Sequence, residues 1–182
     1  MPSGAVSLPP CVDQGIVGQR YDSSGAPRGG EFQIKPGAGR QPAVAAGADG
    51  DFVVVWTSGT RAFGQRYDST GAAQGGEFAV GTSTFQFAPA VAADADGDFV
   101  VVWLGGPPDV DVFGQAFDRA GAPQGGEFRV NTYTTGSQYA QAVASDAAGN
   151  FVVTWACCYP NFDVFGRRFH RARRGGQRGV SE

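Results

Sequence analysis

The sequence has 182 residues, of which 42% are hydrophobic and 17% are charged, with 29 glycines and a net charge of −3. This composition is typical of a turn-rich globular protein and excludes a disordered chain, which would combine low hydrophobicity with high charge. No apolar run approaches the roughly 20 residues of a membrane-spanning helix, so we expect no membrane insertion.

The chain begins with MPSGAVSLPP. This segment carries no basic region and no long apolar one, so it predicts no signal peptide in this chain. Residues 1–14 hold three prolines and show no hydrophobic periodicity, and we interpret them as a linker.

From residue 15 to residue 169 one sequence unit recurs, which predicts a single repeat β domain. Four glycines mark equivalent positions at spacings of 46, 50 and 52 residues: Gly18, Gly64, Gly114 and Gly166. The copies are a partial unit at 15–34, full units at 43–80 and 90–130, and a partial unit at 141–169.

Each full unit predicts four short strands, here called types A to D, bounded by turn residues. Type A is Ala43–Ala46, Ala90–Ala93 and Ala142–Ser145, and type B is Phe52–Trp56, Phe99–Trp103 and Phe151–Trp155. Type C is Ile16–Tyr21, Ala62–Tyr67, Val112–Phe117 and Val164–Phe169, and type D is Glu31–Ile34, Glu77–Val80 and Glu127–Val130. Frequent glycines, with β-branched and aromatic residues in the apolar runs, argue against helix.

Type B is apolar on both faces. In the second full unit Phe99, Val101 and Trp103 point one way, and Val100 and Val102 point the other. A strand with two apolar faces must be covered on both sides, and a neighbouring copy of the unit supplies that cover.

The predicted fold is therefore all-β, with four-stranded antiparallel meanders stacked as β-propeller-like blades. Type A would lie innermost and type D outermost. The strands amount to about three blades, whereas closed propellers have roughly four to eight. We therefore expect an incomplete or open stack, with self-association or further repeats as partners that complete a ring.

The lengths of the connections vary on one edge of the blades only. From A to B the spacing is always 8 residues, and from C to D it is always 11. From B to C it is 7 or 10, and from D to the next A it is 12, 13 or 15. Loops that carry recognition vary above a constant scaffold, although an unconstrained edge would give the same pattern.

Aromatic and acidic residues near this variable edge are the candidate ligand-binding residues, with carbohydrate or a surface protein as the partner. They are Trp103, Asp109, Asp111, Tyr133, Tyr139, Tyr159 and Asp163. Because a tryptophan recurs at the same place in the other units, the pattern favours packing over ligand stacking for Trp103.

The A–B turn of the second full unit carries three alternating carboxylates, Asp94, Asp96 and Asp98. Calcium is the one cofactor that this pattern suggests. However, calcium needs six to eight oxygens, usually with a distal acid, and here a wholly apolar strand follows. A tight Asp-Gly hairpin explains the same residues without a metal.

The three cysteines, Cys11, Cys157 and Cys158, make an odd count. Adjacent cysteines seldom pair with each other. A bridge between Cys11 and Cys158 is conceivable in an oxidising compartment, and free thiols in loops are the alternative. Without a fourth ligand, a zinc site is not expected.

Charged residues give little support for catalysis or nucleic-acid binding. The basic residues 170–182 form a degenerate tail, and the repeats themselves are acidic, so no nucleic-acid partner is expected. His170 is the sole histidine, and no nucleophile, base and orienting group can be assembled around it. The sole lysine, Lys35, is not part of a phosphate-binding loop.

The repeated unit reads VAADADGDFVVVW followed by VFGQAFDRAGAPQGGEFRV. It resembles the roughly 50-residue tandem repeats of large bacterial secreted or surface proteins, often described as adhesin-like or hemagglutinin-like. The resemblance covers Ile16 to about Phe169. It implies propeller-type blades and an extracellular or cell-surface location within a larger protein, and it carries over no catalytic residue.

Three functions follow as hypotheses. The first is a non-catalytic module that binds a ligand through the B–C and D–A loops. The second is a fragment of a propeller-type glycoside hydrolase whose acids come from the same loops. The third is a structural spacer in a longer repeat protein.

Overall fold

The computed structural model describes residues 15–106, 109–157 and 163–170, and thirteen strands lie within them. None of these residues forms a helix, so the described part of the chain contains no helix able to cross a membrane. The strands form four separate antiparallel sheets. The predicted all-β class is confirmed.

Each sheet corresponds to one sequence unit. The half-blade contains β1 (Ile16–Gly18) and β2 (Phe32–Lys35). Blade 1 contains β3 (Gly39–Ala46), β4 (Phe52–Ser58), β5 (Arg61–Tyr67) and β6 (Ala73–Ala79). Blade 2 contains β7 (Gln86–Ala93), β8 (Phe99–Gly105), β9 (Asp111–Phe117) and β10 (Pro123–Arg129). Blade 3 contains β11 (Gln138–Ser145), β12 (Phe151–Cys157) and β13 (Asp163–Phe169).

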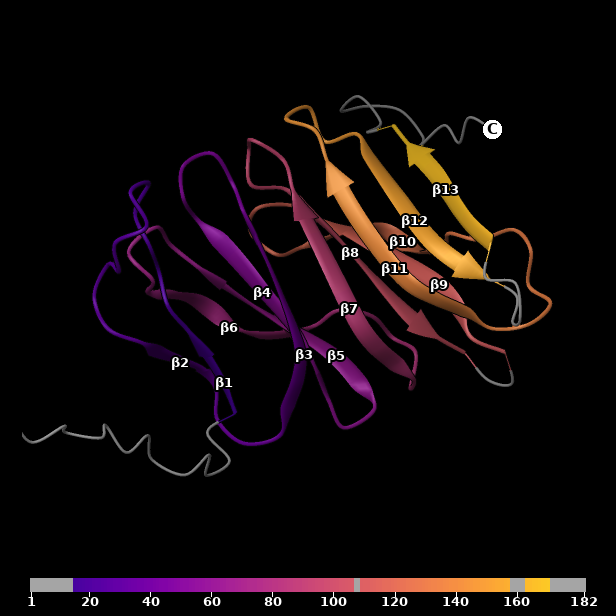
Figure 1. The fold of residues 1–182 in the computed structure, drawn as a ribbon, viewed down its shortest axis with the longest axis horizontal. Helices are drawn as coiled ribbons and strands as arrows, with labels where there is room; N and C mark the ends of the chain where they lie inside the picture. The colour runs from indigo at the N-terminus through magenta and orange to yellow at the C-terminus, as the bar shows by residue number, and fades with distance from the viewer. Residues whose placement is uncertain (1–14, 107–108, 158–162, 171–182) are drawn as a thin grey trace, which may run out of the picture.

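In every sheet the strands pair in chain order, as the meander prediction requires. The sheets stack face to face like propeller blades, and the main contacts between blades 1, 2 and 3 all involve the first strands β7 or β11, with β3 and β4 packing on β7 and β7 and β8 packing on β11. Figure 1 shows the half-blade at one end of this open stack and blade 3 at the other. The alanine-rich composition of these first strands suits their close approach.

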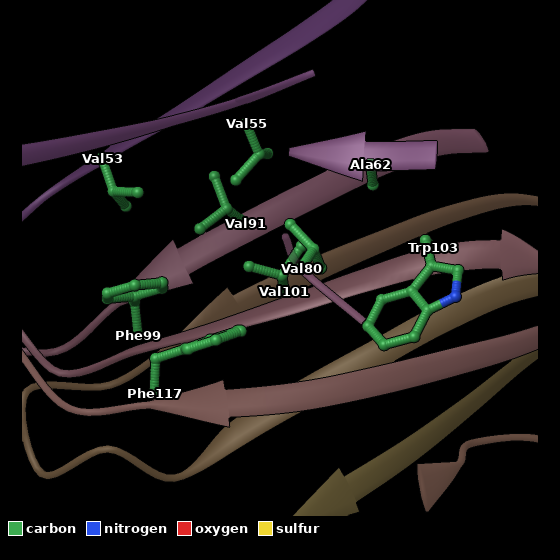
Figure 2. Packing of buried hydrophobic residues seen from close by; sticks show 9 residues of the cluster. All are labelled: Val53, Val55, Ala62, Val80, Val91, Phe99, Val101, Trp103 and Phe117. Atoms are coloured by element: carbon green, nitrogen blue, oxygen red, sulfur yellow. The ribbon is translucent and has the colours of Figure 1, made fainter. Parts of the chain in front are cut away.

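The apolar strands β4, β8 and β12 are the centre of each blade. Figure 2 shows Val53 and Val55 of β4 pointing towards Val91 and Val101 of blade 2. On the opposite face of β8, Val100 and Val102 belong to a second cluster with blade 3. The prediction that this strand type is covered on both sides is thus confirmed for β8, which packs on blade 1 with one face and on blade 3 with the other.

The recurring Phe-Gly and Gly-Glu-Phe motifs are two halves of one packing contact. The ring of Phe78 on β6 lies over Gly64 on β5, and a Cβ added to that glycine would be 2.4 Å from Phe78 Cζ. Phe32 lies over Gly18 and Phe128 over Gly114 in the same way. Glycine is required because the aromatic ring occupies the space of a side chain.

The first strand of each full blade begins four residues earlier than predicted, at Gly39 instead of Ala43 in blade 1. A bulge separates the two parts of this strand. Gln41 lies in it with a φ of 53°, and Ala88 occupies the same place in β7 with a φ of 48°. Because non-glycine residues seldom adopt positive φ, the sequence pattern does not reveal a strand that passes through it.

Arginines of the type C strands form hydrogen bonds from one blade to the next. Arg20 Nη1 donates to the carbonyl oxygen of Ser69 at 2.7 Å, and Arg66 Nη1 donates to that of Arg119 at 2.7 Å. Each guanidinium lies beside a turn glycine of positive φ, Gly71 or Gly121 respectively. The constant length of the C–D connection keeps this turn in reach of the preceding blade.

Within those turns an aspartate accepts hydrogen bonds from the chain that follows it. Asp68 Oδ1 accepts from the Thr70 hydroxyl at 2.6 Å and from the Ala72 amide at 2.9 Å. These bonds lower the pKa of the Asp68 carboxyl below its usual value, and the bond from the Thr70 hydroxyl has the largest effect. Since they favour the charged form, they stabilise the fold only while the carboxylate is ionised.

Stability should therefore depend on Asp68 in the acid range. A depressed folded-state pKa contributes stability above the unfolded pKa of about 3.9, and that contribution is lost as the pH falls through the folded value. Asp68→Asn should flatten this acid limb of the unfolding free energy measured in urea. Thr70→Ala removes only the hydroxyl donor and should flatten it partly. An unchanged acid limb in Asp68→Asn would contradict the assignment.

Candidate functional site

The variable edge is ordered by a buried amide at the end of blade 2. Asn131 is 2% exposed, and its Oδ1 accepts from the Val112 amide at 2.8 Å. Its Nδ2 donates to the Tyr133 carbonyl at 2.9 Å and to Asp111 Oδ1 at 2.6 Å. One side chain thus fixes the start of the D–A loop that follows β10.

A second buried amide fixes the end of the same loop. Gln138 is fully buried, and its Nε2 donates to the Gly136 carbonyl at 3.0 Å. Its backbone amide donates to the Val110 carbonyl at 2.6 Å, while the Val110 amide donates to Ser137 Oγ at 3.3 Å. The B–C loop that carries Asp109 is therefore bonded to the D–A loop.

Two D–A loops share an uncharged, hydroxyl-rich composition with an exposed aromatic ring. We call them the threonine-rich loops, residues 81–85 (GTSTF) and 131–137 (NTYTTGS). Phe85 is 47% exposed in the first and Tyr133 is 56% exposed in the second, and Tyr139 follows at 42%. The remaining D–A loop, which joins β2 to β3 and reads PGA, has no aromatic or hydroxyl residue.

Trp103 does not reach this surface. It is fully buried in the cluster between blades 1 and 2, with its ring stacked near Phe113 at 6.4 Å between centroids. The loop at Gly81 folds over it, since a Cβ on that glycine would lie 2.9 Å from Trp103 Cζ2. The structure therefore assigns Trp103 to the core and leaves no face of it for a sugar to stack on.

The acidic candidates lie in different environments. Asp111 is largely buried and is held by Asn131 and by Arg129, whose Nη1 lies 3.6 Å from Asp111 Oδ2. Asp109 is exposed in its loop, and Asp163 is exposed at the first position of β13. Asp111 is thus a structural partner of the loop. Tyr159 lies outside the described residues.

Sequence reasoning missed Phe85. The signal that could have found it is its setting, because Thr-Ser-Thr-Phe occupies the D–A loop that corresponds to Asn-Thr-Tyr-Thr-Thr one blade later. It also missed Asn131 and Gln138, whose buried amides look like ordinary loop polar residues until their partners are known.

Two carboxylates of the second A–B turn bond to backbone amides, Asp94 within the turn and Asp98 in the C–D turn of the same blade. Asp94 Oδ1 accepts from the amides of Asp96 and Asp98 at 3.0 Å each, and Asp98 Oδ1 accepts from the Arg119 amide at 2.9 Å. Gly97 closes the turn with a φ of 82°. Among the described residues no group of three or more metal-ligating side chains is close enough together to hold a metal ion.

Cys157 is disulfide-bonded and 1% exposed, so the prediction of free thiols is wrong for this residue. The sequence holds two other cysteines, Cys11 and Cys158, and both lie outside the described residues. Gln138 Nε2 lies 3.3 Å from Cys157 Sγ, which links the disulfide to the end of the D–A loop.

No family model matches this chain. No curated protein matches it either. Among solved structures, one similar chain is the GH43 endo-arabinanase from Bacillus licheniformis, with 15% sequence identity and a TM-score of 0.48. The match covers 84% of this chain and 62% of that one, so this chain spans less than two thirds of the length of that protein.

Proposed function

We propose that the chain is a non-catalytic binding module that holds a neutral carbohydrate at the threonine-rich loops. The observation that carries the proposal is that exposed aromatic rings sit on the variable edge, in loops of which the second is fixed by buried amides. Tyrosine and phenylalanine supply a large apolar face at low entropic cost, while hydroxyl groups adapt their hydrogen bonds to a polar ligand.

Loop composition supports a neutral ligand. Residues 81–85 and 131–137 contain no Asp, Glu, Lys or Arg, and the two charged side chains bonded to the first loop, Arg61 and Glu127, are of opposite sign. Their threonine and serine hydroxyls both donate and accept, as sugar hydroxyls do. A loop already fixed by Asn131 and Gln138 loses little freedom on binding, which favours affinity.

The proposed setting is extracellular or on a cell surface, within a longer repeat protein. The resemblance to bacterial adhesin-like repeats supports this proposal, and so does the disulfide at Cys157, because disulfides persist in oxidising compartments. The glycoside-hydrolase alternative would have to rely on Asp109 and Asp163, since Asp111 is engaged by Arg129 and Asn131. Release of dye from chromogenic glycosides would favour that alternative.

Binding should depend on the exposed rings. We expect Tyr133→Ala and Phe85→Ala each to weaken binding to an immobilised neutral polysaccharide by about tenfold or more, as for residues at the centre of an interface. Tyr21→Ala is the matched control, because this tyrosine is 62% exposed but lies next to the C–D turn on the opposite edge.

The measurement is biolayer interferometry against a panel of neutral and acidic polysaccharides. Equal losses in all three variants, or binding to none of the polysaccharides, would overturn the carbohydrate proposal. Binding to an immobilised protein with the same dependence on Tyr133 would redirect it to a protein ligand.

A further inference from the structure

The half-blade is flanked by a groove of about 600 Å³ that separates it from the first strands of blade 1. Its walls are mainly apolar, with Ile16 and Ile34 on the half-blade and Val44 and Val54 on blade 1, and the charged residues Arg20, Arg28 and Asp49 also line it. Among the described strands, β1 pairs only with β2, so the other edge of β1 is open along this groove. An open edge beside an apolar wall is a site for strand addition.

The interface between blades 1 and 2 shows what covers the equivalent surface of the first strand. Val44 on β3 and Val91 on β7 occupy equivalent positions, yet Val44 is 64% exposed and Val91 is 9% exposed. Val91 is covered by the hairpin of β3 and β4, whose Val53 and Val55 point towards it (Figure 2). No equivalent hairpin precedes the half-blade among the described residues, and this difference alone explains why Val44 faces solvent.

We infer that this groove is the seat of an A–B hairpin supplied by another repeat unit of the same kind. The occupant is thus a two-stranded hairpin with a small-residue strand and a strand reading like FVVVW. This inference does not rest on the proposed carbohydrate binding, since it concerns the end of the stack and not the variable edge.

The pairing within the blades fixes the register. In blade 1 Trp56 pairs with Phe63 and Val55 pairs with Gly64. The equivalent residues of β1 are Val17 and Gly18, so the tryptophan of the incoming strand lies opposite Val17 and the valine before it lies opposite Gly18. In that register the incoming strand points two of its valines at Val44. They are the valines one and three residues before its tryptophan, which correspond to Val55 and Val53 of β4.

Residues 1–14 do not read as the occupant. They are MPSGAVSLPPCVDQ and contain no strand like FVVVW and no alanine-rich strand of the first type. The inferred hairpin is therefore one with the sequence of a full repeat unit.

A graft tests the inference directly. Residues 39–60 are placed immediately before Gly15, in place of residues 1–14, which reproduces the spacing that blade 1 has before Arg61. The parent chain for comparison also lacks residues 1–14, so that Cys11 is absent from both proteins. The added hairpin should raise the melting temperature by about 5–10 °C, because it buries apolar surface on both walls of the groove. A control graft carries Val53→Asp and Val55→Asp in the added copy only, and should give no rise.

Val44→Asp, made in both backgrounds, separates the outcomes. In the parent chain this residue is exposed, so the substitution should leave the melting temperature unchanged, whereas in the grafted chain it should remove most of the gain. Equal effects in both backgrounds, or no rise on grafting, would overturn the inference. If the parent chain is a dimer by light scattering and Val44→Asp dissociates it, the groove is filled by another surface of a second copy, because the described A–B hairpins of this chain are each already paired with a third strand, and the inference is overturned.

Discussion

Trp103→Ala should lower the free energy of unfolding by about 3–5 kcal/mol. The indole is fully buried between blades 1 and 2, in one cluster with Val55, Val80 and Val101. Removing it leaves a cavity at the point where the loop at Gly81 closes over the ring. The expected loss is a large share of the 5–15 kcal/mol by which domains are typically stable, and urea denaturation followed by fluorescence measures it.

Tyr133→Ala is the control for this measurement. Its ring is 56% exposed, so truncation should change the unfolding free energy by less than about 0.5 kcal/mol. We therefore expect Trp103→Ala to lose stability in urea denaturation, and Tyr133→Ala to lose affinity in the polysaccharide-binding assay. A Trp103→Ala protein of normal stability that no longer binds carbohydrate would show that the tryptophan contacts ligand after all.

Gly64→Ala should cost about 1–3 kcal/mol through overpacking. The new methyl group would lie 2.4 Å from Phe78 Cζ. The Phe78 ring cannot retreat easily, because its centroid lies 6.0 Å from that of Phe99 and 5.4 Å from that of Phe117 in the next blade. The midpoint of urea denaturation should fall with little change in its slope.

Gly166→Ala is the matched control at the equivalent position of blade 3. A Cβ there meets only ordinary contacts, the nearest being Thr154 Cγ2 at 3.6 Å. Neither glycine has a positive φ, so backbone strain does not distinguish them. We expect Gly166→Ala to be neutral or slightly stabilising, since alanine packs better than glycine in a strand. Similar losses of stability in the two variants would mean that the phenylalanine ring over Gly64 is not the reason for glycine at that position.

The repeat pattern predicted the architecture because each constraint recurs in several copies. Val100 and Val101, on opposite faces of β8, are 4% and 0% exposed, as a strand covered on both faces requires. The outer face of β12 in blade 3 is uncovered among the described residues, since Val152 is 40% exposed there and Thr154 is also exposed. The sequence places threonine at that position where the inner blades have valine.

The sequence could not predict features that depend on a single local conformation. The bulge at Gln41 and Ala88 needs a positive φ at residues that seldom adopt it. The candidate site was only partly predictable for a related reason. Tyr133 and Tyr139 are exposed, but Trp103 lies near the variable end of β8 and is covered by a loop whose path the repeat pattern does not predict.

The stacking of the sheets also determines where the chain should open first. Because the main contacts of each described sheet are with the one before and the one after, cooperativity passes from neighbour to neighbour, as in a one-dimensional array. The two inner sheets, β3–β6 and β7–β10, each have a partner on both sides, whereas the two terminal sheets have one. Amide hydrogen exchange should accordingly be slowest at Val101 and Val102 and fastest in β1 and β13, so the molecule frays inward from its ends.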